Sequence, residues 1–233
     1  MRINKYIAEC GVGSRRACDK LIQEGRVKIN GKPAEIGGEV RLGNDSVTLD
    51  GIKIEPIKKH VYIMLNKPKG CICSKSDEKG RKTVYDYVDI KERLVSVGRL
   101  DYDSEGLLIL TTDGELVNYL THPRNEIPKT YHVKTEGEVA ESDLATLRSG
   151  VVVDGIKTSR AKIKLLDFKE GVSRFEMTIY EGRNRQIKKM FESIGKTVIF
   201  LKRVSIGDLK LGGLSRGAYR GLSAEEVNYL KKL

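Results

Sequence analysis

The sequence predicts an α+β protein with a small N-terminal module and a larger domain. Its 233 residues are enough for one medium domain plus a small one. Residues 129–137 alternate apolar and polar side chains as a strand does, whereas residues 187–194 carry apolar side chains at helical spacing. We therefore expect a small module over 1–47, a linker over 48–60 and a domain of mixed strands and helices over 61–233.

The composition points to a polyanionic partner. The formal net charge is +11 and 32% of the residues are charged, which suits a globular protein that binds nucleic acid rather than a membrane. No apolar run approaches the ~20 residues that span a bilayer. The cysteines lack the spacing of a zinc site, so we expect reduced thiols, no metal and a cytoplasmic location. They are Cys10, Cys18, Cys71 and Cys73.

The N-terminal module has two short helical patterns followed by a strand. Ser14 is a plausible N-cap for the second helix, and Gly25 a plausible C-cap. Val27 and Ile29 then alternate into a strand that turns at Asn30. Basic side chains cluster here and are expected to contact phosphates, which free helix N–H groups also favour. They are Arg15, Arg16, Lys20, Arg26 and Lys28.

The segment Val97–Gly114 places carboxylates next to a buried strand. It begins as a short extended piece in which Arg99 and Asp101 would share one face. A polar loop follows at 103–106, and Leu107 to Leu110 then predict a buried strand. A carboxylate in a basic, polyanion-binding surface weakens binding, so we expect the loop to have a chemical role.

A basic segment near the C-terminal end precedes and covers a predicted helix. Ile187, Met190, Phe191 and Ile194 fall at i, i+3, i+4 and i+7, which predicts the core face of the helix. The basic residues that lie before the helix or largely off this face are Arg183, Arg185, Lys188 and Lys189. We expect Arg185, Lys188 and Lys189 to contact RNA.

Several kinds of chemistry lack their signatures. The sequence contains no nucleoside-triphosphate loop of the form G-x-x-x-x-G-K-[ST] and no dinucleotide fingerprint G-x-G-x-x-G. It also lacks a zinc-deaminase signature and a nucleophile elbow. Carboxylates, basic side chains and a tyrosine remain, and this set suits cofactor-free chemistry on a nucleoside.

Several phrases of the chain resemble the S4-domain branch of the RNA pseudouridine synthases that act on ribosomal RNA. Residues 14–31 resemble the S4 RNA-binding pattern S-R-R-x-x-x-x-L-I-x-x-G-x-V-x-[IV]-N-G. Residues 98–111 are similar to G-R-L-D-x-x-[ST]-x-G-L-[LI]-x-[LF]-T. The phrases N-K-P-x-G at 66–70, K-x-Y-x-V at 129–133 and R-x-x-Q-I at 183–187 also match.

The resemblance implies a fold and a set of roles. It implies a small S4 domain followed by a long, mostly antiparallel sheet flanked by helices. It makes Asp101 the catalytic carboxylate, places Tyr131 against the target base and pairs Arg183 with Asp101. It gives Arg99 a part in holding a flipped-out uridine. From the residues alone, a tyrosine in the core of the domain is an equal interpretation of Tyr131.

The sequence leaves open which group reacts and to which class the protein belongs. Asp103 is a second candidate carboxylate, and Asp101 can act as a nucleophile at C1′ or as a base at the sugar. A non-catalytic RNA-binding factor for ribosome assembly, or a nucleoside hydrolase, would use the same surfaces. The stretch from 121 to 131 resembles the enzymes of the large subunit, so we expect a monomer that acts on 23S ribosomal RNA or a large-subunit assembly intermediate.

Overall fold

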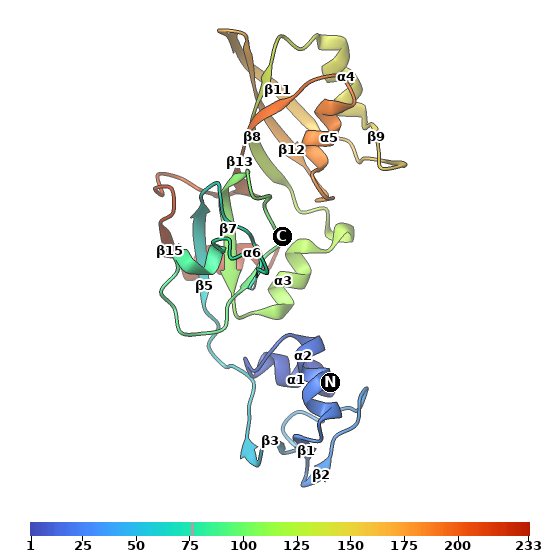
Figure 1. The fold of residues 1–233 in the computed structure, drawn as a ribbon, viewed down its shortest axis with the longest axis vertical. Coiled ribbons are helices and arrows are strands. Elements are labelled where there is room, and N and C mark those ends of the chain that lie inside the picture. Colours follow the sequence, from blue (N-terminus) through green and yellow to red (C-terminus); the bar gives the residue numbers. More distant parts are fainter. Residues whose placement is uncertain (76) are drawn as a thin grey trace. The chain divides into compact units, whose positions relative to one another are not determined.

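The computed structural model describes residues 1–75 and 77–233, which divide into two compact units. The N-terminal unit comprises residues 1–61 with 91–95 and 111–114. The larger unit comprises residues 62–90, 96–110 and 115–233. Figure 1 shows the elements of each unit in sequence colours.

The N-terminal unit packs two helices on a small sheet. The side-chain oxygen of Ser14 accepts a hydrogen bond from the amide of Ala17 at 3.2 Å, which caps the second helix as predicted. One apolar cluster joins the helices to the sheet, and it includes Ile3, Ile7, Cys18, Ile22, Val27 and Val47. The elements are α1 (Ile3–Glu9), α2 (Arg15–Gln23), β1 (Val27–Ile29), β2 (Lys32–Pro33), β3 (Val47–Leu49) and β4 (Ile52–Lys53).

The first part of the linker that we predicted over 48–60 is not a linker in the structure but part of a sheet. Strand β3 pairs antiparallel with β1, and β4 pairs antiparallel with β3. The sheet order is β2-β1-β3-β4, so residues 47–53 belong to the sheet of the N-terminal unit. Strands of two or three residues are too short to show a readable period in the sequence.

The larger unit is built on a long mixed sheet. Its nine strands, as far as the chain is described, run in the order β11-β12-β8-β13-β7-β5-β15, with β14 beside β13 and β6 beside β7. The pairing of β7 with β13 is parallel, whereas β13 with β8, β8 with β12, and β12 with β11 are antiparallel. The strands are β5 (Tyr62–Lys67), β6 (Val95–Ser96), β7 (Glu105–Thr111), β8 (Lys129–Glu136), β11 (Lys162–Lys169), β12 (Val172–Ile179), β13 (Val198–Ile206), β14 (Leu209–Lys210) and β15 (Tyr219–Gly221).

Helices pack on this sheet, and a short hairpin lies beside α5 (Figure 1). The rings of Phe191 on α5 and Phe175 on β12 have centroids 5.4 Å apart, so α5 packs on the sheet through the predicted apolar face. Ser223 and Glu226 form a capping box at the start of the last helix. The helices are α3 (Gly114–Thr121), α4 (Glu141–Ser149), α5 (Gln186–Glu192) and α6 (Ala224–Leu230), with 3-10 turns η1 (Val84–Tyr87) and η2 (Pro123–Asn125) and the hairpin strands β9 (Val152–Val153) and β10 (Ile156–Lys157).

The boundary between loop and strand in the segment 97–114 differs from the prediction. Residues 97–101 form no strand, and β7 begins at Glu105. Gly106 explains the early start, because it has a φ of +108° and pairs with Arg203 of β13. A Cβ atom at this position would lie 2.2 Å from the Arg203 carbonyl oxygen. Glycine therefore lets the two backbones approach.

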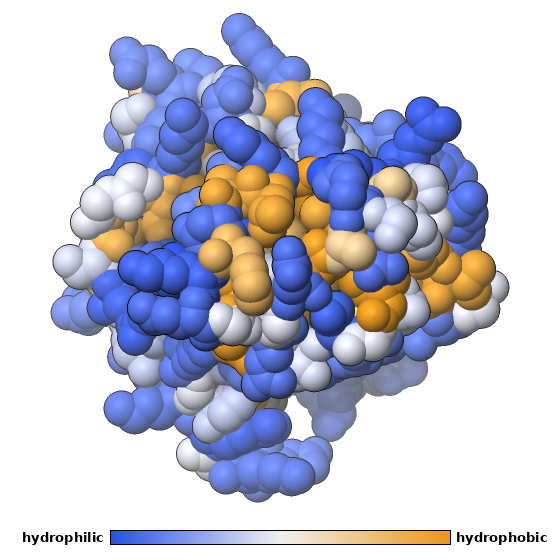
Figure 2. Space-filling model, turned by 90° about the horizontal axis from the view of Figure 1, so that it is seen from above, coloured by the Kyte–Doolittle hydropathy of each residue, from blue (hydrophilic) through white to orange (hydrophobic). Residues whose placement is uncertain are grey.

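Some large apolar side chains are exposed at one end of the larger unit. Figure 2 shows this face, where hydrophobic patches lie among hydrophilic side chains. The exposed apolar residues of β9 to β11 are Val152, Ile156, Leu165, Leu166 and Phe168. Among the described residues, no helix combines the length and the hydropathy that a bilayer crossing needs.

Candidate active site

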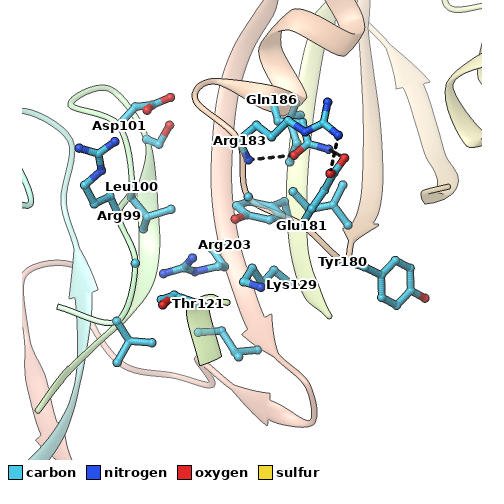
Figure 3. Close-up of a pocket in the computed structure, with 18 of the residues that line it drawn as sticks. Arg99, Leu100, Asp101, Thr121, Lys129, Tyr180, Glu181, Arg183, Gln186 and Arg203 are labelled. Carbon is cyan, nitrogen blue, oxygen red and sulfur yellow. Dashed lines mark hydrogen bonds and ion pairs between the residues drawn. The ribbon is translucent and has the colours of Figure 1, made fainter. Parts of the chain in front are cut away.

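A cavity of about 130 Å³ lies in the larger unit where the loop before β7 faces β8, β13 and the start of α5. The predicted residues Arg99, Asp101, Tyr131 and Arg183 all line it. In the view of Figure 3, Asp101 and Arg99 lie on one side and Arg183 on the other. A cavity of ~150 Å³ is enough to hold a benzene ring, so this one suits a single six-membered ring.

The cationic partner of Asp101 is Lys188, and the predicted pair with Arg183 is wrong in this structure. The ammonium of Lys188 lies 3.5 Å from Oδ2 of Asp101 and also bonds the carboxylate of Asp103. The Lys188 side chain is only 6% exposed. The sequence placed it on the solvated face of the helix, but α5 is short and its first two turns are buried on several sides. Lys188 is therefore a buried residue of the site and not part of a solvated basic face.

The carboxylate of Asp103 is held ionised. Partial burial works to raise the pKa of Asp103, but the hydrogen bond and the charge from Lys188 outweigh it, so this pKa lies below its usual value. The two neighbouring carboxylates thus share one buried ammonium. Asp101 lines the cavity, whereas Asp103 does not. This difference favours Asp101 over Asp103 as the reactive group.

The backbone of the Asp101 loop is tied down by a second buried lysine. The ammonium of Lys67 donates to the carbonyl oxygens of Asp101, Ser104 and Pro68 at 2.9, 2.8 and 3.1 Å. Lys67 is fully buried, and burial lowers its pKa. All three ammonium hydrogens thus have acceptors. The N-K-P-x-G phrase therefore supplies a lysine that positions the Asp101 loop.

Arg183 belongs to a different cluster on the opposite wall (Figure 3). Its guanidinium lies 3.0 Å from the carboxylate of Glu181 and donates to the carbonyls of Ile156 and Lys157. The side-chain amide of Gln186 donates to Glu181 at 2.7 Å, and its oxygen accepts from the Arg183 amide at 3.0 Å. The cluster fixes the turn between β12 and α5.

Tyr131 is a wall of the cavity as well as a core residue. It is 7% exposed and lies on β8 opposite Arg203 of β13 and Met177 of β12. The predicted alternation of β8 is confirmed, since Tyr131 and Val133 are buried and His132 is exposed. The side chain is thus presented to the cavity from a rigid strand.

The floor of the cavity carries two cations that the sequence analysis did not single out. Arg203 is 3% exposed, and its Nε donates to the carbonyl of Leu107 at 2.7 Å. Lys129 donates to the carbonyl of Ile127 at 2.8 Å. Burial, with a contribution from the charge of Arg203, lowers the pKa of Lys129 to about 8. We call Arg203 and Lys129 the floor cations.

The remaining predicted RNA contacts divide into free and paired side chains. Among the described residues, Arg16, Lys20, Lys28 and Arg99 have no ion-pair partner and are exposed; Arg15 is also exposed and donates to Asn4 at 3.3 Å. The paired ones are Arg26 with Asp50, Arg185 with Glu192, and Lys189 with Asp154.

Sequence reasoning missed the floor cations and the roles of Lys67, Lys188 and Glu181. A signal existed for Lys129, which opens the K-x-Y-x-V phrase. Arg203 gave no signal, because it follows an apolar strand in which a basic residue suggests the solvated end. Only the parallel pairing of β7 with β13 brings it under the cavity.

Comparisons with known proteins agree with this architecture. The family model for RNA pseudouridylate synthase matches residues 61–193, and the S4 domain model matches residues 1–47. The chain is 46% identical to ribosomal large subunit pseudouridine synthase B of Bacillus subtilis, covering 100% of this chain and 96% of the relative. It is 39% identical to the dual-specificity RNA pseudouridine synthase RluF of Escherichia coli, covering 100% and 79%.

A solved structure of a pseudouridylate synthase superposes on the whole chain. The TM-score is 0.73 at 35% identity, and the match covers 99% of each chain. The fold class and the chemistry expected from the sequence therefore agree with these comparisons. The chain belongs to the RNA pseudouridine synthase family and carries an S4 domain at its N-terminal end.

Proposed function

We propose that the chain isomerises a uridine of large-subunit ribosomal RNA to pseudouridine, with Asp101 as the catalytic carboxylate and no cofactor. The observation that carries this proposal is the place of Asp101: it lines a cavity sized for one ring, beside a buried ammonium, and Tyr131 lines the same cavity. Family membership supports the reaction, and the relatives named for the large subunit support the substrate.

The reaction needs three events at one nucleoside. The N1–C1′ bond breaks, the uracil turns, and C5 joins C1′ while its proton leaves. A carboxylate serves the first event as nucleophile at C1′ or as base at the sugar, and Lys188 keeps Asp101 positioned for either. The target uridine leaves its stack to reach the cavity. Tyr131 lies against the base and assists removal of the C5 proton, and Arg99 holds the flipped arrangement at the exposed rim.

Arg183 keeps a place in the proposed site with a changed role. Its ion pair with Glu181 and its bonds to the β10 backbone support a positioning function for the wall that closes on the base. It reaches the reaction through this wall rather than through a pair with Asp101.

The S4 domain supplies affinity by contacts to phosphates. Its exposed basic side chains without an ion-pair partner among the described residues lie on the surface of the matched S4 domain; they are Arg15, Arg16, Lys20 and Lys28. Arg185 and Lys189 would add contacts near the cavity once RNA competes with their carboxylate partners. We further propose that the protein acts in the cytoplasm as a monomer on 23S ribosomal RNA or a large-subunit assembly intermediate.

One experiment tests the catalytic proposal. Ribosomal RNA from cells that lack the protein is incubated with the wild-type chain and with Asp101→Asn, and pseudouridine is mapped. The wild type should convert one uridine and the variant none, while RNA affinity holds or increases because a negative charge is lost. Equal conversion by Asp101→Asn would contradict the assignment and turn attention to Asp103. Release of free uracil would indicate a hydrolase, and binding without conversion an assembly factor.

A further inference from the structure

Arg203 is a buried cation whose donors are mostly unused by the protein. A guanidinium has five N–H donors, and only the Nε donor of Arg203 has an acceptor among the described residues. The Nη2 atom is buried without a partner. An unsatisfied buried polar group costs about 1–3 kcal/mol, and more when it is charged. Such a side chain in a cavity wall points to a ligand that accepts hydrogen bonds.

Lys129 lies beside Arg203, and most of its hydrogen-bond donors also lack an acceptor among the described residues. Its ammonium carries three donors, and the carbonyl of Ile127 is its one acceptor in the described chain. The nearest candidates to neutralise the pair are engaged elsewhere, since Asp101 bonds Lys188 and Glu181 bonds Arg183. Within the described residues, the two cations thus share the floor without a carboxylate partner. Figure 3 shows both side chains between the wall of Asp101 and the wall of Glu181.

We propose that Arg203 and Lys129 bind the carbonyl oxygens of the flipped uracil and stabilise the negative charge that it gains when the N1–C1′ bond breaks. This inference rests on the proposed function and deepens it. It makes the floor cations catalytic residues, because they would touch the reacting base. They would bind the base, while the carboxylate of Asp101 acts at the sugar.

The chemistry of the reaction calls for such a floor. When the N1–C1′ bond breaks, N1 keeps the electron pair, and the charge is shared with O2 and O4. Fixed hydrogen-bond donors stabilise charge most where it develops in an enclosed site. When the ring turns about the axis through N3 and C6, C5 takes the place of N1 and O4 takes the place of O2. One fixed pair of donors therefore meets a carbonyl oxygen before and after the turn.

The surroundings favour a base over a phosphate at this position. The floor lies among Leu120, Leu201 and Ile206, and the ring of Tyr131 forms part of the same wall. A planar ring with apolar faces fits these side chains, whereas a phosphate would lose its hydration against them. The exposed cation Arg99 at the rim is the better phosphate partner.

The test compares atoms of the substrate with variants of the floor. A short RNA around the mapped uridine is made with uridine, 2-thiouridine or 4-thiouridine at the target, or with a methylphosphonate at its 5′ phosphate. Single-turnover rates at saturating RNA are measured for wild type, Lys129→Met and Arg203→Lys. The matched control is Lys162→Met, on exposed β11 and outside the cavity.

The proposal expects Lys129→Met to lower the rate with uridine by about 10-fold to 100-fold, the worth of a hydrogen bond to a charged group, with RNA affinity changed less than about threefold. Sulfur is a weaker hydrogen-bond acceptor than oxygen, so at least one thio substitution should change the rate of the wild type relative to its rate with uridine. In Lys129→Met the same ratio of rates should lie closer to one, because the contact is already lost. The rate of Arg203→Lys should fall between those of wild type and Lys129→Met. The melting temperature of Arg203→Lys shows whether this variant folds. Lys162→Met should equal wild type.

Four results would overturn the inference. Full rates in Lys129→Met, or thio effects that are identical in wild type and variant, would remove the contact with the base. A methylphosphonate effect that disappears in Lys129→Met would assign the floor to a phosphate. If the wild type forms no pseudouridine in any ribosomal RNA, the proposed function fails and this inference with it, whereas a wild type that works beside unaffected variants overturns the floor alone.

Discussion

The ammonium of Lys188 lies 3.5 Å from Oδ2 of Asp101 and holds that carboxylate from the helix side of the cavity. Because Lys188 is buried and Asp101 only partly so, losing the lysine should cost about 1–3 kcal/mol in the transition state. We expect Lys188→Met to reduce the single-turnover rate at saturating RNA by ~10-fold to 100-fold, and Lys188→Arg to fall between. Lys210→Met, an exposed lysine on β14, is the control. A loss of affinity at an unchanged rate would instead make Lys188 a phosphate contact.

The partners of Arg183 can be tested by double-mutant cycles in urea. Arg183→Ala and Glu181→Gln remove the same ion pair, so their effects on the free energy of unfolding should be non-additive by about 0.5–2 kcal/mol. Arg183→Ala and Asp101→Asn share no ion pair and should add within ~0.5 kcal/mol. Additivity in the first cycle and coupling in the second would restore the pair that the sequence predicted.

The close approach at Gly106 predicts a severe substitution. In Gly106→Ala the new Cβ would lie 2.2 Å from the backbone oxygen of Arg203, at a φ of +108°. Strain and displaced strands should lower the free energy of unfolding by more than ~3 kcal/mol. Gly114→Ala, at the start of α3 with no atom within 4 Å of the new Cβ, should change it by less than ~1 kcal/mol. Equal urea midpoints for both variants would contradict the close parallel pairing of β7 with β13 at Gly106.

The S4 domain predicts a change in salt dependence. Replacing Arg15 and Arg16 by alanine should lower the slope of log K against log salt by ~0.7–0.9 for each phosphate that these side chains neutralise. Arg26→Ala should change the slope less, because Arg26 is already paired with Asp50 and Glu24. Binding titrations from low to high salt measure all three variants. Identical slopes would show that this surface does not bind RNA.

Lys129 predicts a pH dependence of stability. Burial lowers the pKa of Lys129 to about 8 in the folded protein, so above this pH the unfolded chain binds more protons than the folded one. The free energy of unfolding therefore rises with pH, because the cost of burying a charged lysine disappears. From about pH 7 to 10, wild type should gain on the order of 2 kcal/mol relative to Lys129→Met. Burial raises the pKa of Cys10 to about 12, which acts in the opposite direction, but this effect cancels between the two proteins. A difference that is flat with pH would mean an ordinary, solvated amine.

The elements with long patterns were predictable from the sequence. The apolar spacing of Ile187, Met190 and Phe191 gave α5, and the alternation around Tyr131 gave β8. Ser14 and Ser223 marked helix starts, because capping chemistry is local. Elements of two or three residues, such as β4 and β6, lack enough positions to show a period.

The candidate site was predictable in its residues and less so in its contacts. Motif phrases brought Asp101, Tyr131 and Arg183 to one cavity, but which cation meets which carboxylate depends on how α5 lies on the sheet. A helix of two turns buries positions that an amphipathic pattern assigns to solvent, and Lys188 is one of them. Arg203 depends on a long-range parallel pairing that no local pattern encodes.

The parallel pairing of β7 with β13 determines when a growing chain completes its cavity. Arg203 bonds the carbonyl of Leu107, 96 residues earlier, and contacts between residues so far apart in the sequence form slowly during folding. The ribosome has released residues 1–47 long before it makes β13. A nascent chain therefore has its complete RNA-binding module while the floor of its cavity is still being synthesised, and it becomes competent for chemistry only after β13 has been made.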